Sequence, residues 1–253
     1  MARAARYGGG VADGEVLDAF AAEAQSLAAA LAGESPAAFG RPSPCPPWTV
    51  AELFWHVTTA AGRVSGMLAE PEPEPEPEPG TGDPRAGGPG LVSAAGYYQP
   101  DQRFSAATNA DRIGSAQRGS AGLGPAELRA EFDRAWPLAW AAARDARPGR
   151  RVRTRHGDLM LLTEFMRSRV LELAVHGLDL AAGTGRDPWL TDLAAGVVQD
   201  LILPGPGGAE ALLRTQLGWD RVTLIAKATG RRPLTAVERA AVQAAGVRWL
   251  ALA

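Results

Sequence analysis

The chain has 253 residues, of which 46% are hydrophobic, so it can build a sizeable core in one large domain or in a domain with an appendage. Its formal net charge of −2 gives no electrostatic reason to expect nucleic acid or an anionic membrane as a partner. A single cysteine, Cys45, excludes an intramolecular disulfide, and no apolar run approaches the roughly 20 residues that span a bilayer. The N-terminus lacks the apolar segment of a signal peptide, and we therefore expect a soluble cytoplasmic protein.

Two amphipathic helices are predicted in the N-terminal part. The first covers about 16–31, where apolar residues recur at helical spacing. The second follows a proline-rich segment, and it begins sharply because Thr49 and Glu52 have the spacing of a capping box. It continues to about residue 68 and carries His56 at the edge of its apolar face.

The segment 70–79 reads EPEPEPEPEP and interrupts the helical pattern. A proline at every second residue and the absence of any core-forming side chain predict an extended, solvated linker of polyproline type, and we treat about 70–90 as a flexible insertion. The following residues are rich in glycine and alanine, with a short helix expected over 109–118. A third clear helix runs from Pro125 to about Arg144.

The C-terminal half is also expected to be helical. A basic turn region over 147–157 precedes a fourth helix, predicted over 163–182. Shorter helices separated by glycine or proline are predicted at 189–203, 209–217, 219–229 and 234–244, before a last extended segment or strand, VRWLALA. The sequence thus predicts a mainly α protein with a four-helix bundle in residues 1–185 and a small, mostly helical extension in residues 186–253.

The fourth predicted helix carries an ionisable seam within an apolar segment, RVLELAVHGLDLAAGTG. Arg169, Glu172, His176 and Asp179 fall within an arc of about 80°, whereas an ordinary amphipathic helix spreads its polar residues over a wide face. Glu172 and His176 are four residues apart, so both can face one metal ion. His56 is the only histidine central to another predicted helix, and it is the candidate third ligand. Two imidazoles and a carboxylate suit Zn²⁺ and leave a fourth position open.

The same residues also allow a purely structural interpretation. Glu172 and His176 can form a buried hydrogen-bonded pair with Arg169 as counter-ion and no chemical role. His56, taken alone, can be a satisfied histidine at the edge of the core. The spacing by itself leaves both interpretations open.

Three further residues are given minor roles. Cys45 is about 16 Å from His56 along a helical path, so we expect it to pack beside Trp48 and not to act as a reactive thiol. Asp179 is expected either to accept a hydrogen bond from a ligand or to bond at a helix end. His156 is expected to be a loop histidine, because a ligand role would require its loop to fold back over the bundle.

Two sequence motifs match signatures of a known family. CPPWTVAELFWH is similar to a motif of the form C-P-G-W-T-V-x-x-L-x-x-H, with Pro47 in place of the usual glycine. RSRVLELAVHGLDLAAGTGR is similar to R-V-x-E-x-x-x-H-x-x-D-L, and ATGRRPLTAVER is similar to the C-terminal tail of the same group. Through these motifs the chain resembles the mycothiol-dependent maleylpyruvate isomerase family of actinobacterial type.

The resemblance implies a DinB-like four-helix bundle that holds a divalent metal, usually zinc, through three side chains. The histidine of the first signature falls on His56, and the glutamate and histidine of the second fall on Glu172 and His176. Members of known activity use the low-molecular-weight thiol mycothiol, either as cofactor for the cis–trans isomerisation of maleylpyruvate or as a nucleophile. Metal coordination stabilises such a thiol as thiolate, which can attack an electrophilic carbon.

Anionic ligands need cationic partners, and arginine supplies them in a bidentate geometry. Arg63 in the second helix, Arg112 in the NADRI segment and Arg169 in the seam are the candidate catalytic arginines. Arg231 and Arg232, in TGRRP, are candidates to bind the thiol cofactor from the C-terminal extension.

We therefore expect a divalent-metal-dependent isomerase or S-transferase that acts on a small electrophile with the help of a thiol. Neither nucleic acid nor membrane is an expected partner, and the oligomeric state is open, with a homodimer as one option. A second hypothesis is a hydrolase with metal-bound water as nucleophile. A third is a non-catalytic binding or regulatory module whose metal is structural or absent. The ligand set also leaves Ni²⁺, Mn²⁺ and Fe²⁺ open.

Overall fold

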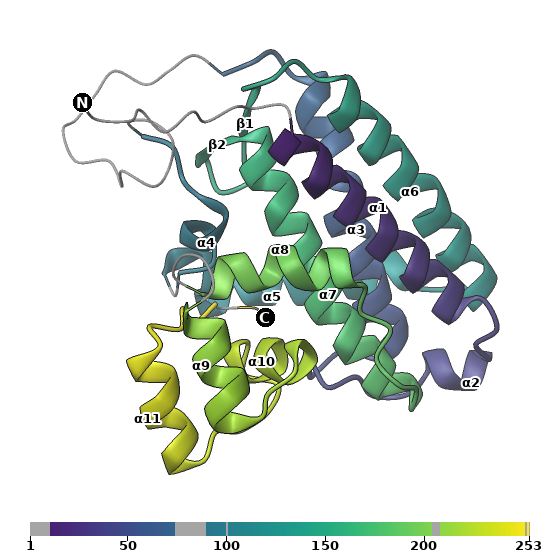
Figure 1. Cartoon of the computed structure of the whole chain (residues 1–253). Helices are drawn as coiled ribbons and strands as arrows, with labels where there is room; N and C mark the ends of the chain where they lie inside the picture. The colour runs from purple at the N-terminus through teal and green to yellow at the C-terminus, as the bar shows by residue number, and fades with distance from the viewer. Residues whose placement is uncertain (1–10, 74–89, 100, 204–207, 251, 253) are drawn as a thin grey trace, which may run out of the picture.

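The computed structural model describes residues 11–73, 90–99, 101–203, 208–250 and 252, and it is mainly helical, as predicted (Figure 1). Its centre is a bundle of four long helices, in which α1 and α3 each pack against both α6 and α7. The bounds of these helices are α1 Val11–Leu31, α3 Val50–Ala69, α6 Pro125–Asp145 and α7 Leu162–Thr184. They match the four predicted helices to within a few residues, except at the start of the first.

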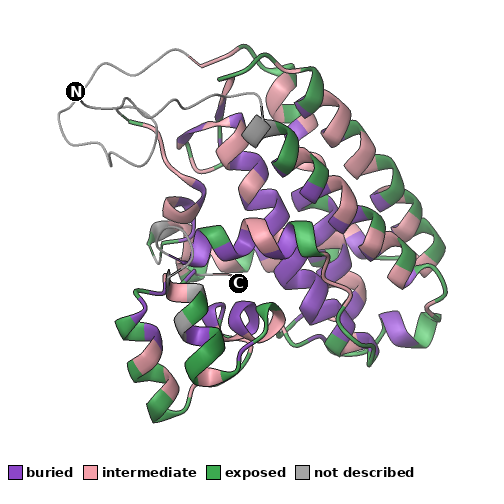
Figure 2. Ribbon diagram, in the orientation of Figure 1, coloured by how far each residue is buried: buried purple, intermediate pink, exposed green. Residues whose placement is uncertain are grey.

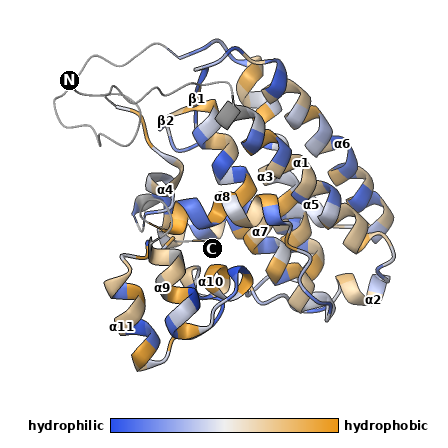
Figure 3. Cartoon of the chain, in the orientation of Figure 1, coloured by the Kyte–Doolittle hydropathy of each residue, from blue (hydrophilic) through white to orange (hydrophobic). Residues whose placement is uncertain are grey.

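Local sequence signals explain where two bundle helices begin. The predicted capping box is present, because the Thr49 hydroxyl accepts from the amide of Glu52 at 3.3 Å while the Glu52 carboxylate accepts from the amide of Thr49 at 2.7 Å. The helix α6 begins at Pro125, whose missing N–H costs nothing in the first turn. Figure 3 shows hydrophilic and hydrophobic residues alternating along α6, as expected for a helix with one solvated side.

The seam helix α7 is the most deeply buried element of the bundle (Figure 2). From Ser168 to Ala181 every residue is buried except Glu172, which is partly exposed. The helices α1, α3 and α8 (Asp192–Ile202) all pack against it. Its apolar composition therefore reflects burial on several sides, and the ionisable residues it carries are held inside the protein.

Several short elements stand where the sequence predicts only loops. Residues 151–153 (β1), within the predicted basic turn region, pair with residues 159–161 (β2), just after it, in an antiparallel hairpin with Arg151 opposite Leu161. The additional elements are α2 Pro36–Phe39, α4 Ala94–Tyr97 and the 3-10 helix η1 Gln102–Phe104. The predicted short helix over 109–118 is the longer α5, Ala106–Ser120, which packs against α3.

The start of the Glu-Pro tract is anchored to the bundle. The carboxylate of Glu72 contacts Arg147 at 2.5 Å and Arg150 at 3.4 Å, and it also accepts from the backbone amide of Arg151 at 3.2 Å. The prediction of a solvated tract is wrong at Glu72, because the tract passes the basic turn region and finds cationic partners there. Most of the predicted flexible insertion, residues 74–89, lies outside the described residues.

The residues after Gly185 form the predicted short helices α8, α9 (Gly208–Leu217), α10 (Arg221–Ala228) and α11 (Ala236–Ala244). The helices α9 to α11 lie together at one end of the molecule (Figure 1), and α10 packs against α8 and α7. The described residues of VRWLALA form no strand. A domain boundary near residue 185 stays a prediction. Among the described helices, none has the length and apolar character that a bilayer crossing needs.

Candidate metal centre

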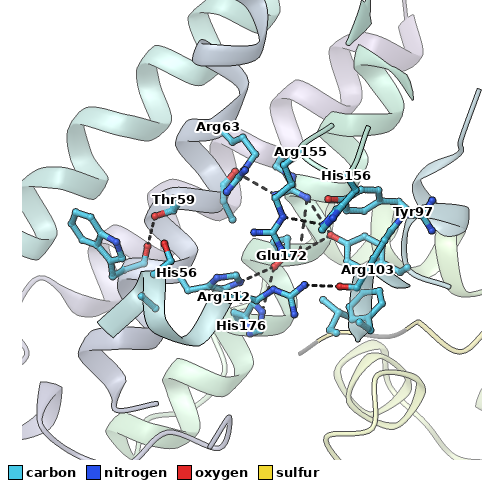
Figure 4. Close-up of a pocket in the computed structure, with 18 residues that line it drawn as sticks. His56, Thr59, Arg63, Tyr97, Arg103, Arg112, Arg155, His156, Glu172 and His176 are labelled. Atoms are coloured by element: carbon cyan, nitrogen blue, oxygen red, sulfur yellow. Dashed lines mark hydrogen bonds and ion pairs between the residues drawn. The ribbon is translucent and has the colours of Figure 1, made fainter. Parts of the chain in front are cut away.

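The packing of α3 against α7 brings His56, Glu172 and His176 together. One carboxylate oxygen, Oε2 of Glu172, lies 3.5 Å from Nε2 of His56 and 3.3 Å from Nε2 of His176. The two imidazole rings are almost perpendicular, with centroids 5.2 Å apart. Figure 4 shows the three side chains meeting at one end of a pocket.

The spacing of these donor atoms fits a divalent cation. Metal–ligand bonds of about 2.0–2.2 Å at tetrahedral angles place neighbouring ligand atoms roughly 3.3–3.5 Å apart, which is the separation of the Glu172 oxygen from both nitrogens. Two imidazole nitrogens and one carboxylate oxygen are a donor set that Zn²⁺ and other borderline cations accept. The residues present therefore fit a metal of this class.

Each of the three side chains is held in place by a different neighbour. The His56 ring stacks on Trp48, with centroids 4.9 Å apart. Oε1 of Glu172 accepts a 2.8 Å hydrogen bond from the Tyr98 hydroxyl, and this leaves Oε2 of Glu172 to face the histidines. Nδ1 of His176 lies 2.9 Å from Oδ2 of Asp179. Since a carboxylate only accepts, Nδ1 carries the proton and Nε2 is directed at Glu172.

The ionisation states of two of these groups suit metal ligands. Burial would raise the pKa of Glu172, but hydrogen bonds from His176 and His56 and the charge of Arg169 hold that pKa well below its usual range. Burial lowers the pKa of His56 to about 4, so its ring is neutral near pH 7. Metal binding requires both forms, a carboxylate and a neutral imidazole.

His176 is surrounded by groups that favour a positive charge on its ring. Burial would lower its pKa, but hydrogen bonds with Asp179, Cys45 and Glu172 outweigh burial and raise the pKa well above its ordinary value. The same surroundings that favour a second proton on this ring favour a cation at Nε2.

The pocket in front of these residues is lined by arginine. Its arginines come from several elements and are Arg63, Arg103, Arg112, Arg155 and Arg169. Figure 4 shows the guanidinium groups of Arg63, Arg112 and Arg155 gathered near Glu172. Among the described residues, no carboxylate lies within ion-pair distance of any of these three. The pocket therefore carries an excess of positive charge.

Two of these arginines, Arg63 and Arg112, are partly removed from solvent. Burial and the charges of Arg169 and Arg155 lower the pKa of Arg63 to about 10. Arg112 is buried, and the acceptors of its guanidinium among the described residues are both neutral, the Asn109 side chain at 2.5 Å and the Arg103 carbonyl at 3.2 Å. In such a cluster the positive charges repel one another, and an anionic ligand would stabilise it.

Comparison with known proteins finds a family match whose span includes the three candidate ligands. The family model described as the mycothiol maleylpyruvate isomerase N-terminal domain matches residues 20–181. The chain belongs to this family. No curated protein is significantly similar to the chain in sequence.

Two solved structures are similar to the chain, each with 17% identity over 74% of this chain and 67% of the other. One is a histidine-to-alanine mutant of the mycothiol-dependent maleylpyruvate isomerase, with a TM-score of 0.50, and the other is the isomerase itself, with a TM-score of 0.49. At this identity the likeness concerns the fold. The predicted DinB-like helical fold is confirmed by the family match and by this likeness.

The arginines that the sequence points to lie in different places in this family member. Arg63, Arg112 and Arg169 all line the pocket. Arg231 is not among the lining residues, and its Nη2 instead lies 2.9 Å from Oδ2 of Asp179. Arg232 is exposed, and its guanidinium donates to Thr223 of its own segment at 3.4 Å. Neither C-terminal arginine is therefore positioned as a wall of this pocket, because Arg231 turns inward to a buried carboxylate and Arg232 turns outward to solvent.

Cys45 lies close to Trp48, whose backbone amide donates to the Cys45 carbonyl at 3.0 Å, and it also reaches the seam. Its Sγ donates to Oδ2 of Asp179 at 3.1 Å, and Cys45, Asp179 and His176 form a second compact group of potential ligands. The helical path assumed from the sequence does not apply, because the chain folds back on itself between Pro42 and Thr49. Asp179 bonds to His176 and α7 continues beyond it, so Asp179 does not bond at the helix end. Its support of a metal ligand stays a prediction, because it depends on metal binding by His176.

Other pocket residues could not be found from their sequence spacing. Tyr97, Tyr98 and Arg103 come from the segment after the Glu-Pro tract, which has no strong periodicity. Arg155 and His156 come from the β1–β2 loop, which does fold back over the bundle and is held there by ion pairing of Arg103 with Asp158. Burial and the charge of Arg155 lower the pKa of His156 to about 4. The paired tyrosines in YYQPDQR are the one sequence feature that could have predicted this side of the pocket.

Proposed function

We propose that this chain is a divalent-metal-dependent enzyme that uses a low-molecular-weight thiol, mycothiol or a close analogue, to isomerise or substitute a small anionic electrophile. The observation that carries the proposal is the single Glu172 oxygen between the Nε2 atoms of His56 and His176. It lies at the end of a pocket where Arg63, Arg112 and Arg155 have no carboxylate partner among the described residues. The family match supports the thiol, because the family is described by mycothiol and maleylpyruvate.

In this proposal His56, Glu172 and His176 hold the metal, with Zn²⁺ as the first candidate. When bound, the metal supplies a Lewis acid that stabilises a coordinated thiol as thiolate at neutral pH. The protein contributes the orientation of its donors: Tyr98 holds one oxygen of Glu172, and Asp179 holds the His176 ring through Nδ1. Their role is to hold the donor atoms of Glu172 and His176 in place, so that the pocket side of the site would stay open to thiol and substrate.

The arginines define the class of substrate. Arg63, Arg112 and Arg155 are positioned to bind carboxylate groups and to orient the electrophilic carbon toward the metal side of the pocket. Trp55 and Phe104 line the same pocket and exclude water from an unsaturated carbon chain. A small di- or tricarboxylate with a conjugated double bond has the charge and shape for this site, and maleylpyruvate, named for the similar solved enzyme, is one example.

The decisive first test is metal content by elemental mass spectrometry on untagged protein. The test variant is His176→Ala, and the matched control is His156→Ala, which removes a pocket histidine outside the proposed ligand set. We expect close to one metal per chain in the wild type and the control, and its loss in the test variant. A wild type that contains no metal and takes none up on reconstitution would refute the proposal.

Activity then separates thiol chemistry from hydrolysis. The metal-loaded protein is assayed with unsaturated dicarboxylates in the presence and absence of mycothiol. We expect turnover that requires the thiol and is lost in the His176→Ala variant. Turnover that proceeds equally without thiol would refute the thiol part of the proposal and favour metal-bound water as the nucleophile.

A further inference from the structure

A buried carboxylate behind His176 connects the candidate metal centre to the C-terminal segment. Asp179 has a side chain only 2% exposed, and its oxygens accept from three different parts of the chain. Nδ1 of His176 lies at 2.9 Å, Sγ of Cys45 at 3.1 Å, and the Arg231 guanidinium at 2.9 Å through Nη2. Arg231 also places Nε at 3.2 Å from the other carboxylate oxygen.

The contact of Arg231 with Asp179 is bidentate, and this geometry affects the orientation of the His176 ring. Two parallel N–H donors define both the position and the plane of the carboxylate. With the plane fixed, Oδ2 faces Nδ1 of His176, and the imidazole is held in the orientation that directs Nε2 at Glu172. A buried carboxylate without this counter-ion would have to find another donor, and the histidine would lose its fixed partner.

Arg231 is itself placed by the fold of the C-terminal segment. It follows α10 through a turn at Gly230, which has a φ of 77°, and its backbone amide donates to the Ala226 carbonyl at 2.7 Å. Its Nη1 donates to the Thr229 carbonyl at 2.8 Å. Because α10 packs on α8 and α7, the guanidinium reaches Asp179 from a segment beyond residues 20–181, the part that matches the family model.

We infer that Arg231 is a positioning residue for the metal ligand His176, acting through Asp179, and that the C-terminal segment thereby sets the metal affinity of the bundle. The inference rests on the proposed metal-dependent function. It assigns Arg231 a role behind the metal centre, in contrast to a direct contact with the thiol or the substrate.

The test is the Zn²⁺ dissociation constant of the full chain, measured by competition with a chromophoric chelator. Arg231→Gln and Asp179→Asn are the test variants. The matched control is Arg221→Gln, which removes an exposed arginine of the same segment that also pairs with an aspartate, Asp192 at 3.4 Å. Outer partners of metal ligands typically contribute about 10- to 100-fold in affinity, so we expect a weakening of this size in both test variants and none in the control.

A double variant and a spectrum distinguish positioning from general damage. If Arg231 acts through Asp179, the double variant Asp179→Asn, Arg231→Gln should bind Zn²⁺ no more weakly than Asp179→Asn alone. The visible spectrum of the Co²⁺ form should change in Arg231→Gln and stay that of the wild type in Arg221→Gln, with unchanged far-ultraviolet circular dichroism in both variants.

The outcomes separate this inference from the proposed function. A wild type that binds Zn²⁺ while Arg231→Gln binds it equally well would overturn the inference and leave the metal centre intact. Losses in the two single variants that add in the double variant would overturn the action through Asp179. A wild type that binds no Zn²⁺ would overturn the proposed function together with the inference.

Discussion

The hydroxyl of Tyr98 donates a 2.8 Å hydrogen bond to Oε1 of Glu172, across 74 residues of sequence. The phenolic oxygen of Tyr98 also lies 3.0 Å from the Ser168 carbonyl and 3.4 Å from Nη2 of Arg169. Burial and the charge of Glu172 raise the pKa of Tyr98 well above its usual range, so the phenol remains a donor. With Oε1 occupied, Oε2 of Glu172 is the oxygen that faces the two histidines.

Removal of this hydroxyl should weaken metal binding without unfolding the protein. In Tyr98→Phe, Glu172 loses a hydrogen-bond donor and gains rotational freedom. We expect the Zn²⁺ affinity to fall by at least about 10-fold. The buried hydrogen bond should also be worth about 1–2 kcal/mol of unfolding free energy. Chelator competition and urea denaturation measure the two effects.

Tyr97→Phe is the matched control for that substitution. Tyr97 is the adjacent tyrosine and lines the same pocket, and within the described residues its hydroxyl has no hydrogen-bond partner. Equal Zn²⁺ affinity in the two variants would show that Tyr98 does not orient Glu172.

Loss of a pocket arginine should weaken anion binding. Arg63→Gln removes a charge that no carboxylate of the described residues neutralises, and a charge-assisted contact of about 1.5–3 kcal/mol corresponds to roughly a 10- to 100-fold loss in affinity. Calorimetric titration with maleate, a simple dicarboxylate, measures it. Arg134→Gln, on an exposed pair with Glu131 on α6, is the control and should bind as the wild type does. Tight maleate binding by Arg63→Gln would argue against this part of the proposed site.

The close contact of Gly119 with Trp55 should make the pocket wall sensitive to one added methyl group. A Cβ at Gly119 would lie 1.9 Å from Nε1 of Trp55, which lines the pocket. In Gly119→Ala the indole has to move, and we expect a destabilisation of about 1–3 kcal/mol and a change in tryptophan fluorescence.

The same substitution at Gly196 should have the opposite effect on stability. Gly196 lies within α8, and an added Cβ there would meet nothing within 4 Å. The substitution should stabilise the protein by about 0.5–1 kcal/mol through helix propensity. Urea denaturation of both variants checks the pair, and a neutral Gly119→Ala would contradict the packing of Trp55 described above.

Glu23 should impose a pH dependence on stability. Burial raises its pKa, with hydrogen bonds from Thr191 offsetting part of the rise, and its Oε1 has no hydrogen-bond partner in the part of the chain that the structure describes. Between the ordinary and the raised pKa the unfolded chain releases this proton and the folded chain keeps it, so native stability falls as pH rises through that interval. In Glu23→Gln this loss is absent.

The stability of Glu23→Gln relative to the wild type should therefore increase as the pH rises above the ordinary value of about 4.5. Urea denaturation at a series of pH values between about 4.5 and 8 gives this difference directly. Parallel stability curves for the two proteins would show that Glu23 titrates normally in the folded state.

Much of the fold and part of the candidate site follow from local sequence patterns. The Thr49–Glu52 capping box specifies the start of α3 because both partners lie within one turn. Glu172 and His176 face the same direction because they are four residues apart on one helix. His56 was reached by elimination and by the family motif, and α3 does pack against α7 at that residue.

The remaining positions depend on long-range packing. Cys45 reaches Asp179 only because the chain folds back before α3, and Tyr98 reaches Glu172 only because its segment packs beside α7. Arg231 meets Asp179 through the packing of α10 on the bundle. Periodicity and spacing therefore determined the helices and the candidate ligand pair, Glu172 and His176, within one of them. The partners that orient this pair required the tertiary structure, because nothing in local sequence encodes which distant donor meets a buried carboxylate.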